Sequence, residues 1–256
     1  MRIVFFGTPD FVEPVIESLE KNFDLVKVIR NPQQLNSEII GELKEIKPDL
    51  FVVAAFGKIL PGEILEIPRL GTMNIHPSLL QKYRGPSPIQ SAILNDDKTT
   101  GVTIIKMDEK MDHGPILHQS EEQILSDDTF ESLAKRLFSL STNSMVDVII
   151  RYNEITPKIQ DDSKATYTNL LTRGDGYLNI DSLEVGNSKL EIERAVRAYH
   201  PWPGVWTKFR LNDNEVIIKL LPERMVQVEG KKPMSYKDFK NGYENGKNFL
   251  EKLSLI

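Results

Sequence analysis

Two polar residues end an otherwise apolar stretch in the first half of the chain. The segment MNIHPSLLQKYRGPSPI, residues 73–89, places Asn74 and His76 two positions apart, immediately before Pro77. Alternate residues of a strand point to the same face, so the two side chains can converge on one small space. Buried polar groups are costly unless they form hydrogen bonds, so this pair needs polar partners. Without such partners, Asn74 would be a turn former and His76 an ordinary buried histidine.

Carboxylates in the segment DEKMDHGPI, residues 108–116, are the candidate partners. The run GVTIIKM before it predicts a strand, and Asp108 or Asp112 can reach the same crevice if that strand neighbours the one ending at His76. An Asn, a His and an Asp together suit acyl-type transfer to an amine. Asn can donate to the developing oxyanion, His can exchange a proton, and Asp can orient the His or take the proton of the amine.

The elements that position these residues alternate along the first half of the chain. RIVFFG, LVKVIR, DLFVVAAF and GTMNIH predict buried strands, and DFVEPVIESLEKN and NSEIIGELKEIKP show helical periodicity. Continuously apolar strands that alternate with helices predict a doubly wound α/β domain, in which helices cover both faces of a parallel sheet. In such sheets, ligands bind beyond the carboxyl ends of the strands, which is where Asn74 and His76 lie.

The second half is organised differently. After a polar strand at 116–124 and a long helix at 127–153, the polar segment 157–169 predicts a linker. A helix and two strand-like runs follow, and they predict a small β-rich, barrel-like module similar to an OB fold. We therefore predict a catalytic domain at residues 1–165, followed by a linker and a C-terminal domain at 166–256.

Composition narrows the possible chemistry. The chain has no cysteine, which excludes disulfides, cysteine-ligated zinc and thiol catalysis, and its four histidines show no metal-binding spacing, so we expect no metal. No secretion signal or membrane span is evident, so we expect a cytoplasmic monomer that does not bind membranes. The net charge of −5 divides into −8 for residues 1–162 and +3 for the remainder, which leaves a mildly basic second part.

NIHPSLLQKYRGPSP and MDHGPIL together resemble the signature of the folate-dependent formyltransferases, Asn-x-His-Pro-Ser-Leu-Leu-Pro and Asp-x-Gly-x-Ile. The resemblance implies catalytic roles for Asn74, His76 and Asp112, and 10-formyltetrahydrofolate as the formyl-donating co-substrate. FGKIL resembles the segment that lines the pterin pocket in this family. The folate contacts that the resemblance implies are Phe56, Gly57, Lys58, Ile59, Leu60, Ser78, Leu79, Leu80, Gln81 and Asp108. Gln81 replaces the proline of the family pattern.

The second half resembles one branch of that family. ATYTNLL, IERAVRAYHPWPGVWT and VQVEGKKPMSYKDFKNGY are similar to the C-terminal part of methionyl-tRNA formyltransferases, so the resemblance covers nearly the whole chain. It implies that the acceptor is the free α-amino group of initiator methionyl-tRNA, in translation initiation. A tRNA partner requires phosphate contacts from basic side chains. The candidates are Arg84, Lys208, Arg210, Lys231 and Lys232, although surface lysines also occur as an ordinary solvated face.

One departure from that branch leaves other functions open. Residues 31–37, NPQQLNS, contain no lysine or arginine, whereas the tRNA enzymes carry a long basic, glycine-rich loop in the corresponding region. One alternative is a sugar N-formyltransferase that acts on a nucleotide-linked amino sugar with the same catalytic trio. Another is a non-catalytic folate- or RNA-binding relative, which the intact trio argues against. The segment RAYHPWPGVW favours the tRNA enzyme over the sugar enzyme.

Overall fold

The computed structural model describes residues 1–180, 188–212 and 214–256, which divide into two compact units. Unit 1 comprises Met1–Ile89, Lys98–Ile124 and Ser132–Asn169, and unit 2 comprises Gln90–Asp97, Leu125–Glu131 and the described residues of Leu170–Ile256. We describe each unit by itself. The domain boundary predicted after residue 165 stays a prediction.

Unit 1 is built on a six-stranded sheet. Its strand order is β2-β1-β3-β4-β5-β6, and the first four strands pair in parallel. The strands are β1 (Arg2–Phe6), β2 (Asp24–Ile29), β3 (Leu50–Ala54), β4 (Thr72–His76), β5 (Thr99–Lys106) and β6 (Ile116–Gln123). The α/β fold class predicted from the sequence is confirmed. However, β5 and β6 both run antiparallel to their neighbours, so the sheet is mixed.

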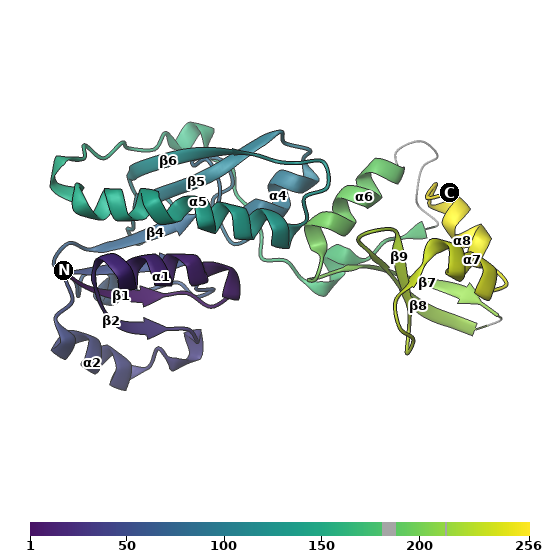
Figure 1. Cartoon of the computed structure of the whole chain (residues 1–256), viewed down its shortest axis with the longest axis horizontal. Helices are drawn as coiled ribbons and strands as arrows, with labels where there is room; N and C mark the ends of the chain where they lie inside the picture. The colour runs from purple at the N-terminus through teal and green to yellow at the C-terminus, as the bar shows by residue number, and fades with distance from the viewer. Residues whose placement is uncertain (181–187, 213) are drawn as a thin grey trace. The chain divides into compact units, whose positions relative to one another are not determined.

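Helices cover this sheet because each has one apolar stripe. They are α1 (Glu13–Asn22), α2 (Ser37–Ile46), the short α3 (Gly62–Leu65) and α5 (Phe130–Ile150). A further helix, α4 (Pro88–Leu94), starts in unit 1, but most of its residues belong to unit 2. Asn36 caps α2, since its side chain accepts a hydrogen bond from the N–H of Ile39. Leu43 of α2 packs into one buried cluster with Val4, Phe6 and other side chains from the same face of the sheet. Figure 1 shows α1 and α5 lying across the sheet.

The polar segment 157–169, predicted as a linker, is instead part of unit 1. Lys158 forms an antiparallel bridge with Ile116, and Tyr167 forms a parallel bridge with Arg84. The N–H of Arg84 donates to the carbonyl of Thr166 at 2.8 Å. The linker prediction is wrong because a polar segment need not be solvated: residues of this one pair with β6 and with the loop that follows β4.

Unit 2 contains a four-stranded antiparallel sheet in the order β10-β9-β8-β7, as expected for a small β-rich module. Its elements are α6 (Ser188–Tyr199), β7 (Val205–Leu211), β8 (Asn214–Leu221), β9 (Met225–Val228), β10 (Met234–Ser235), α7 (Tyr236–Gly242) and α8 (Gly246–Lys252). Ile218 and Val226 of the sheet share one buried core with Phe239 of α7 and Phe249 of α8. The two terminal helices therefore close one face of the sheet.

Candidate active site

Strand β4 brings two polar side chains to one face of the sheet. Asn74 and His76 alternate with the buried apolar residues Met73 and Ile75, so their side chains point to the opposite side from those two. His76 is only 3% exposed, whereas Asn74 is partly exposed. The pair lies at the carboxyl end of β4, and the chain leaves the strand at Pro77.

Asp112 contacts both of these side chains. Asn74 Nδ2 donates to Asp112 Oδ1 at 3.2 Å, and His76 Nδ1 lies 3.5 Å from Asp112 Oδ2. The backbone N–H of Gly85 also donates to Asp112 Oδ2, at 2.8 Å. The Asp112 side chain remains 14% exposed, so three protein groups hold a carboxylate that a ligand can still reach. The structure thus brings together the three residues that the sequence singles out.

The orientation of the His76 ring is set from its other side. His76 Nε2 lies 2.9 Å from the carbonyl oxygen of Tyr83. A carbonyl only accepts hydrogen bonds, so Nε2 carries a proton and donates it to Tyr83. Nδ1 then faces the Asp112 carboxylate, and a proton on Nδ1 would complete an ion pair. Nε2 is therefore hydrogen-bonded to a protein oxygen, and Nδ1 lies within ion-pair distance of another.

Asp112 reaches this place by a route that the sequence did not indicate. Because β5 is antiparallel to β4, its last residue, Lys106, pairs with Met73 at the start of β4 rather than with the end that carries His76. The loop after β5 folds back over the sheet and carries Asp112, whose φ of 47° is left-handed. The return is tight, because a Cβ on Gly114 would overlap the carbonyl oxygen of Lys106.

Comparisons with known proteins identify the family. A family model described as Formyl transferase matches residues 21–149, which is half of the chain. The curated methionyl-tRNA formyltransferase of Roseiflexus sp. (strain RS-1) is 39% identical over 244 aligned residues, which cover 82% of this chain and 74% of that protein. The chain belongs to the methionyl-tRNA formyltransferase family. It is a formyltransferase, as the sequence predicted.

Solved structures share the fold of this formyltransferase family. The methionyl-tRNA formyltransferase from Clostridium thermocellum matches with a TM-score of 0.72 and 19% identity, over 92% of this chain and 99% of that chain. A sugar N-formyltransferase from Shewanella sp FDAARGOS_354 matches with a TM-score of 0.67 and 20% identity, over 87% of this chain and 98% of that chain. At these identities the two matches show the fold alone.

The residues predicted to bind folate divide into a buried and an exposed group. Phe56 and Leu60 are buried in the core of unit 1, where Phe6 and Phe56 form an edge-to-face ring contact. Between them, Gly57 has a φ of 74° with open space beside its Cα, and Ile59 is 70% exposed. The part of FGKIL that can contact a ligand is thus its exposed middle, and the two apolar ends anchor it.

Side chains of β5 and β6 form hydrogen bonds with the loop that follows β4. The Thr103 hydroxyl accepts a hydrogen bond from the N–H of Leu80 at 3.0 Å and donates to the carbonyl of Ser78 at 2.6 Å. Gln119 Nε2 donates to the Leu80 carbonyl at 2.7 Å. The Leu80–Gln81 peptide bond is cis, and Gln81 Oε1 accepts from the N–H of Asp161 at 2.6 Å. These hydrogen bonds pair the backbone groups of Ser78 and Leu80 and the side chain of Gln81 with other parts of unit 1.

Two other predicted contacts have partners within unit 1. Asp108 Oδ2 lies 2.6 Å from His113 Nδ1, so this carboxylate is paired with a neighbour in its own loop. Lys58 Nζ donates to the carbonyl of Pro32 at 3.2 Å and ties down the short segment 31–37. Lys58 thereby holds one end of the segment 31–37 in place.

The residues predicted to contact tRNA lie in very different surroundings. Arg84 is 1% exposed, and its guanidinium donates to side chains of unit 1, so a phosphate contact would require breaking those bonds. Lys208 and Arg210 lie on β7, where Lys208 Nζ is 3.5 Å from Glu215 Oε2. Lys231 and Lys232 are exposed beyond the end of β9. Burial therefore argues against Arg84 as a tRNA contact, and the other four remain predictions.

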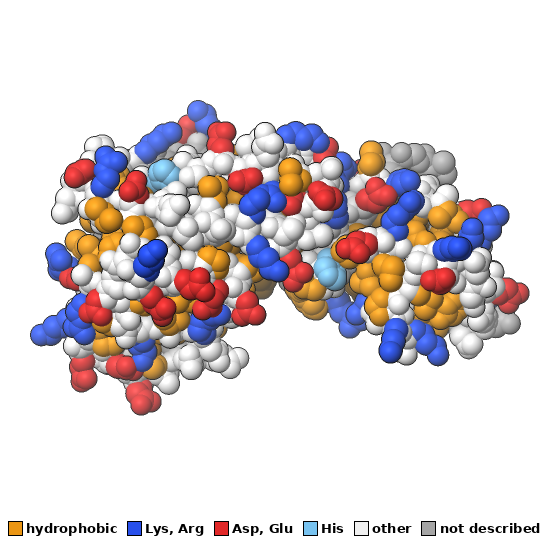
Figure 2. All heavy atoms as spheres, viewed as in Figure 1, with side chains coloured by type: hydrophobic (Ala, Val, Ile, Leu, Met, Phe, Trp, Pro, Cys, Tyr) orange, Lys and Arg blue, Asp and Glu red, His pale blue; other side chains and the backbone are white. Residues whose placement is uncertain are grey.

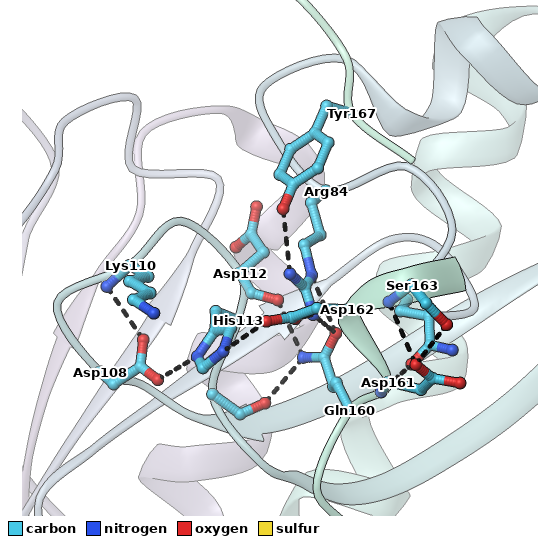
Figure 3. A network of polar contacts seen from close by, with 12 residues as sticks. Arg84, Asp108, Lys110, Asp112, His113, Gln160, Asp161, Asp162, Ser163 and Tyr167 are labelled. Carbon is cyan, nitrogen blue, oxygen red and sulfur yellow. Dashed lines mark hydrogen bonds and ion pairs between the residues drawn. The ribbon is translucent and has the colours of Figure 1, made fainter. Parts of the chain in front are cut away.

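Sequence reasoning missed the residues that support the trio. Tyr83 and Gly85 contact His76 and Asp112, and Gln160 donates to the backbone on both sides of His113 (Figure 3). The sequence signal for these supporting residues was Gln160 and the β-branched residues at the end of the polar segment 157–169.

The described ranges, 1–180, 188–212 and 214–256, contain neither a metal-binding cluster nor a membrane-spanning helix. No group of three or more His, Cys, Asp or Glu side chains is arranged to hold a metal ion there. Among the same residues, no helix has the length and hydropathy needed to span a membrane.

Proposed function

We propose that this formyltransferase moves the formyl group of 10-formyltetrahydrofolate onto the free α-amino group of methionyl-tRNA. The observation that carries the proposal is the convergence of Asn74, His76 and Asp112, because an amide donor, an imidazole and an accessible carboxylate meet without a serine or cysteine nucleophile. Direct attack by an amine needs no such nucleophile. It needs an oxyanion donor and a proton acceptor, and the trio contains both.

Asn74 and Asp112 take the two roles that touch the reacting groups. An amide NH₂ has two hydrogens, so Asn74 can donate one to Asp112 Oδ1 and the other to the formyl oxygen, where negative charge develops. Asp112 takes a proton from the attacking amine, directly or through one water molecule. Preorganised donors act strongly here because the site is partly withdrawn from solvent.

His76 acts through Asp112 in this arrangement. Its Nε2–H is occupied by the Tyr83 carbonyl and its Nδ1 faces Asp112, so neither nitrogen is left to bind the formyl oxygen. We propose that His76 orients the carboxylate and that a proton on Nδ1 offsets its charge. This refines the proton-exchanging role that the sequence suggests for His76.

The residues around the trio fit a folate. A flat pterin needs apolar surface and backbone hydrogen-bonding groups. In the segment Gly57–Ile59, the exposed Ile59 side chain offers the apolar surface, and the exposed Gly57 offers its backbone groups. Gly57, Ile59 and the loop Ser78–Gln81 would hold the molecule. When bound, 10-formyltetrahydrofolate supplies the activated formyl group.

The tRNA acceptor is favoured by the relatives named methionyl-tRNA formyltransferase, which extend over most of the chain. Phosphate contacts would come from the exposed basic residues of unit 2, Lys208, Arg210, Lys231 and Lys232. Figure 2 shows basic and acidic side chains interspersed over the face in view. The electrostatic contribution to tRNA binding should therefore be modest.

A nucleotide-linked amino sugar is the second candidate acceptor. One observation favours it: the segment 31–37 contains no basic residue and forms only a short turn at Pro32–Gln34, whose first carbonyl is held by Lys58. The same trio would serve the amine of such a sugar.

A competition experiment separates the two acceptors. The purified chain is mixed with isotopically labelled 10-formyltetrahydrofolate, methionyl-tRNA and a panel of nucleotide-linked amino sugars, and products are identified by mass spectrometry. We expect label on the methionine amine and at most a trace on the sugars. Label on a sugar with none on methionyl-tRNA would establish the second candidate in place of the first.

A further inference from the structure

The most deeply buried charge described in unit 1 lies beside the trio rather than within it. The Arg84 side chain is 1% exposed and carries a guanidinium that is always ionised. A buried charge is destabilising unless its donors are paired. Arg84 Nε and Nη2 both donate to Gln160 Oε1, at 3.0 and 2.8 Å, while Nη2 also reaches Asp162 and Nη1 reaches the Tyr167 hydroxyl.

This arrangement fixes the orientation of the Gln160 amide. The amide oxygen receives two N–H donors from Arg84, and only an oxygen can accept them. The amide nitrogen therefore points the other way, where it donates to the carbonyls of Asp112 at 2.9 Å and Gly114 at 2.7 Å. Figure 3 shows the amide placed between the guanidinium and the loop.

The two carbonyls belong to the loop that presents the catalytic carboxylate. Asp112 has a φ of 47°, a left-handed conformation that is unfavourable for a non-glycine residue and persists only where its surroundings enforce it. The amide nitrogen of Gln160 donates a hydrogen bond to the backbone carbonyl of Asp112 itself. Rotation of this backbone would swing the carboxylate away from His76 and Asn74.

We propose that Arg84 and Gln160 form a brace that sets the position of the Asp112 carboxylate against His76 and Asn74. Both are positioning residues, because they act through Asp112 and the structure engages their polar groups within the protein. All three residues of the stretch Tyr83–Gly85 then support the trio. Tyr83 orients His76 and Gly85 donates to Asp112, while the Arg84 side chain orients Gln160. The inference rests on the proposed catalytic role of Asp112.

Asp162 forms a second arm of the brace, which links Arg84 to His113. Asp162 Oδ1 accepts from Arg84 Nη2 at 2.9 Å, and Asp162 Oδ2 lies 3.4 Å from His113 Nε2. His113 Nδ1 faces Asp108 at 2.6 Å (Figure 3). The hydrogen bond from Arg84 is the main cause that lowers the pKa of Asp162. This arm is more exposed than Gln160, so we expect it to matter less.

Gln160→Glu tests the brace directly. The glutamate oxygens keep Arg84 paired but cannot donate to the carbonyls of Asp112 and Gly114, so the loop is released while the buried charge stays satisfied. We expect kcat to fall about 10-fold or more, with KM for both substrates within twofold. We also expect a changed pH–rate profile and changed ¹⁵N shifts of the His76 ring. Gln123→Glu adds the same charge at an exposed position on β6 and should match the wild type.

The ¹⁵N shifts are measured without substrate, so they test the brace independently of the acceptor. A folded Gln160→Glu protein with wild-type kcat and unchanged His76 shifts would overturn the proposal. If Gln160→Glu does not fold, Gln160→Asn replaces it: the shorter amide should lower kcat and shift the His76 signals in the same direction, and unchanged values would again overturn the brace. Asp162→Asn should keep kcat within about twofold, since Gln160 remains paired with Arg84. A loss as large as that of Gln160→Glu would move the brace from Gln160 to Asp162.

Discussion

At the scale of single residues, the proposed mechanism depends on the N–H of Asn74 that does not donate to Asp112. Its side chain is partly exposed and gives one N–H to Asp112 at 3.2 Å. The remaining N–H is the only donor of the trio that we assign to the formyl oxygen, because both nitrogens of His76 are engaged. Loss of Asn74 should therefore affect the transition state far more than the binding of substrates.

Asn74→Ala should lower kcat by about 10²-fold or more, which is the usual effect of a missing oxyanion donor, and leave KM nearly unchanged. Steady-state kinetics and circular dichroism on the same preparation check this, and Asn22→Ala at the end of α1 is the matched surface control. An Asn74→Ala enzyme as active as the wild type would remove the residue from its assigned role.

At the scale of elements, the loop from β5 to β6 is restricted by a single glycine. A Cβ at Gly114 would overlap the Lys106 carbonyl, whereas a Cβ at Gly41, in the exposed part of α2, would meet open space. Gly114→Ala should destabilise unit 1 by about 1–3 kcal/mol through overpacking and should reduce kcat through Asp112. Gly41→Ala should stabilise it by about 0.5–1 kcal/mol, since alanine favours helix.

Urea unfolding followed by circular dichroism, together with formyl-transfer kinetics, measures both glycine variants. Equal stability and activity of Gly114→Ala and the wild type would show that the loop does not need this close approach. A loss of stability in Gly41→Ala would mean that α2 is restricted by more than helix propensity.

Tyr236, the first residue of α7, should make unit 2 less stable at high pH. Burial raises the pKa of Tyr236 to about 12, although the positive charge of Arg224 acts in the opposite direction. Below pH 10 the tyrosine is neutral in both folded and unfolded states, so its contribution is complete. Between pH 10 and 12 only the unfolded state ionises, and about 3 kcal/mol of the free energy of unfolding should be lost.

Tryptophan fluorescence can follow this loss, because the two tryptophans of the chain, Trp202 and Trp206, both lie in unit 2. Urea unfolding at pH 9, 10 and 11 should show the wild type weakening more steeply than Tyr236→Phe. Parallel pH dependence of the two proteins would rule out Tyr236 as the cause.

Periodicity predicted most of these elements, but it does not encode strand direction. The strand ending in Asn74 and His76 was predictable because polar side chains two apart, at the end of an apolar run, need a common partner. The antiparallel β5 was not, since an apolar run has the same pattern in either direction. The Gln160 brace was also beyond sequence reasoning, because Gln160 pairs with residues 76 and 48 positions away in the chain.

At the scale of the whole chain, the acidic charge and the short segment 31–37 should limit electrostatic binding of tRNA. The net charge is −5, and Gln33 and Gln34 in this segment are exposed and uncharged. We expect the affinity for methionyl-tRNA to depend only weakly on salt, because few counterions are released. A binding series at increasing KCl concentration measures the slope of log K against log salt.

A steep slope in the wild type would contradict this expectation. The double variant Gln33→Lys, Gln34→Lys provides the comparison: if the segment faces the nucleic acid, each new phosphate contact should steepen the slope by roughly 0.7–0.9. An unchanged slope would place segment 31–37 away from the tRNA.

The most direct test of the central claim is single-turnover transfer of labelled formyl to methionyl-tRNA by the wild type and by Asp112→Asn. The asparagine preserves the shape of the side chain but neither accepts the amine's proton nor carries the charge that faces His76. We predict rapid transfer by the wild type and a transfer step at least about 10²-fold slower in the variant, with the binding of both substrates retained. Wild-type rates in a folded Asp112→Asn protein, or no transfer to methionyl-tRNA by the wild type, would contradict the account.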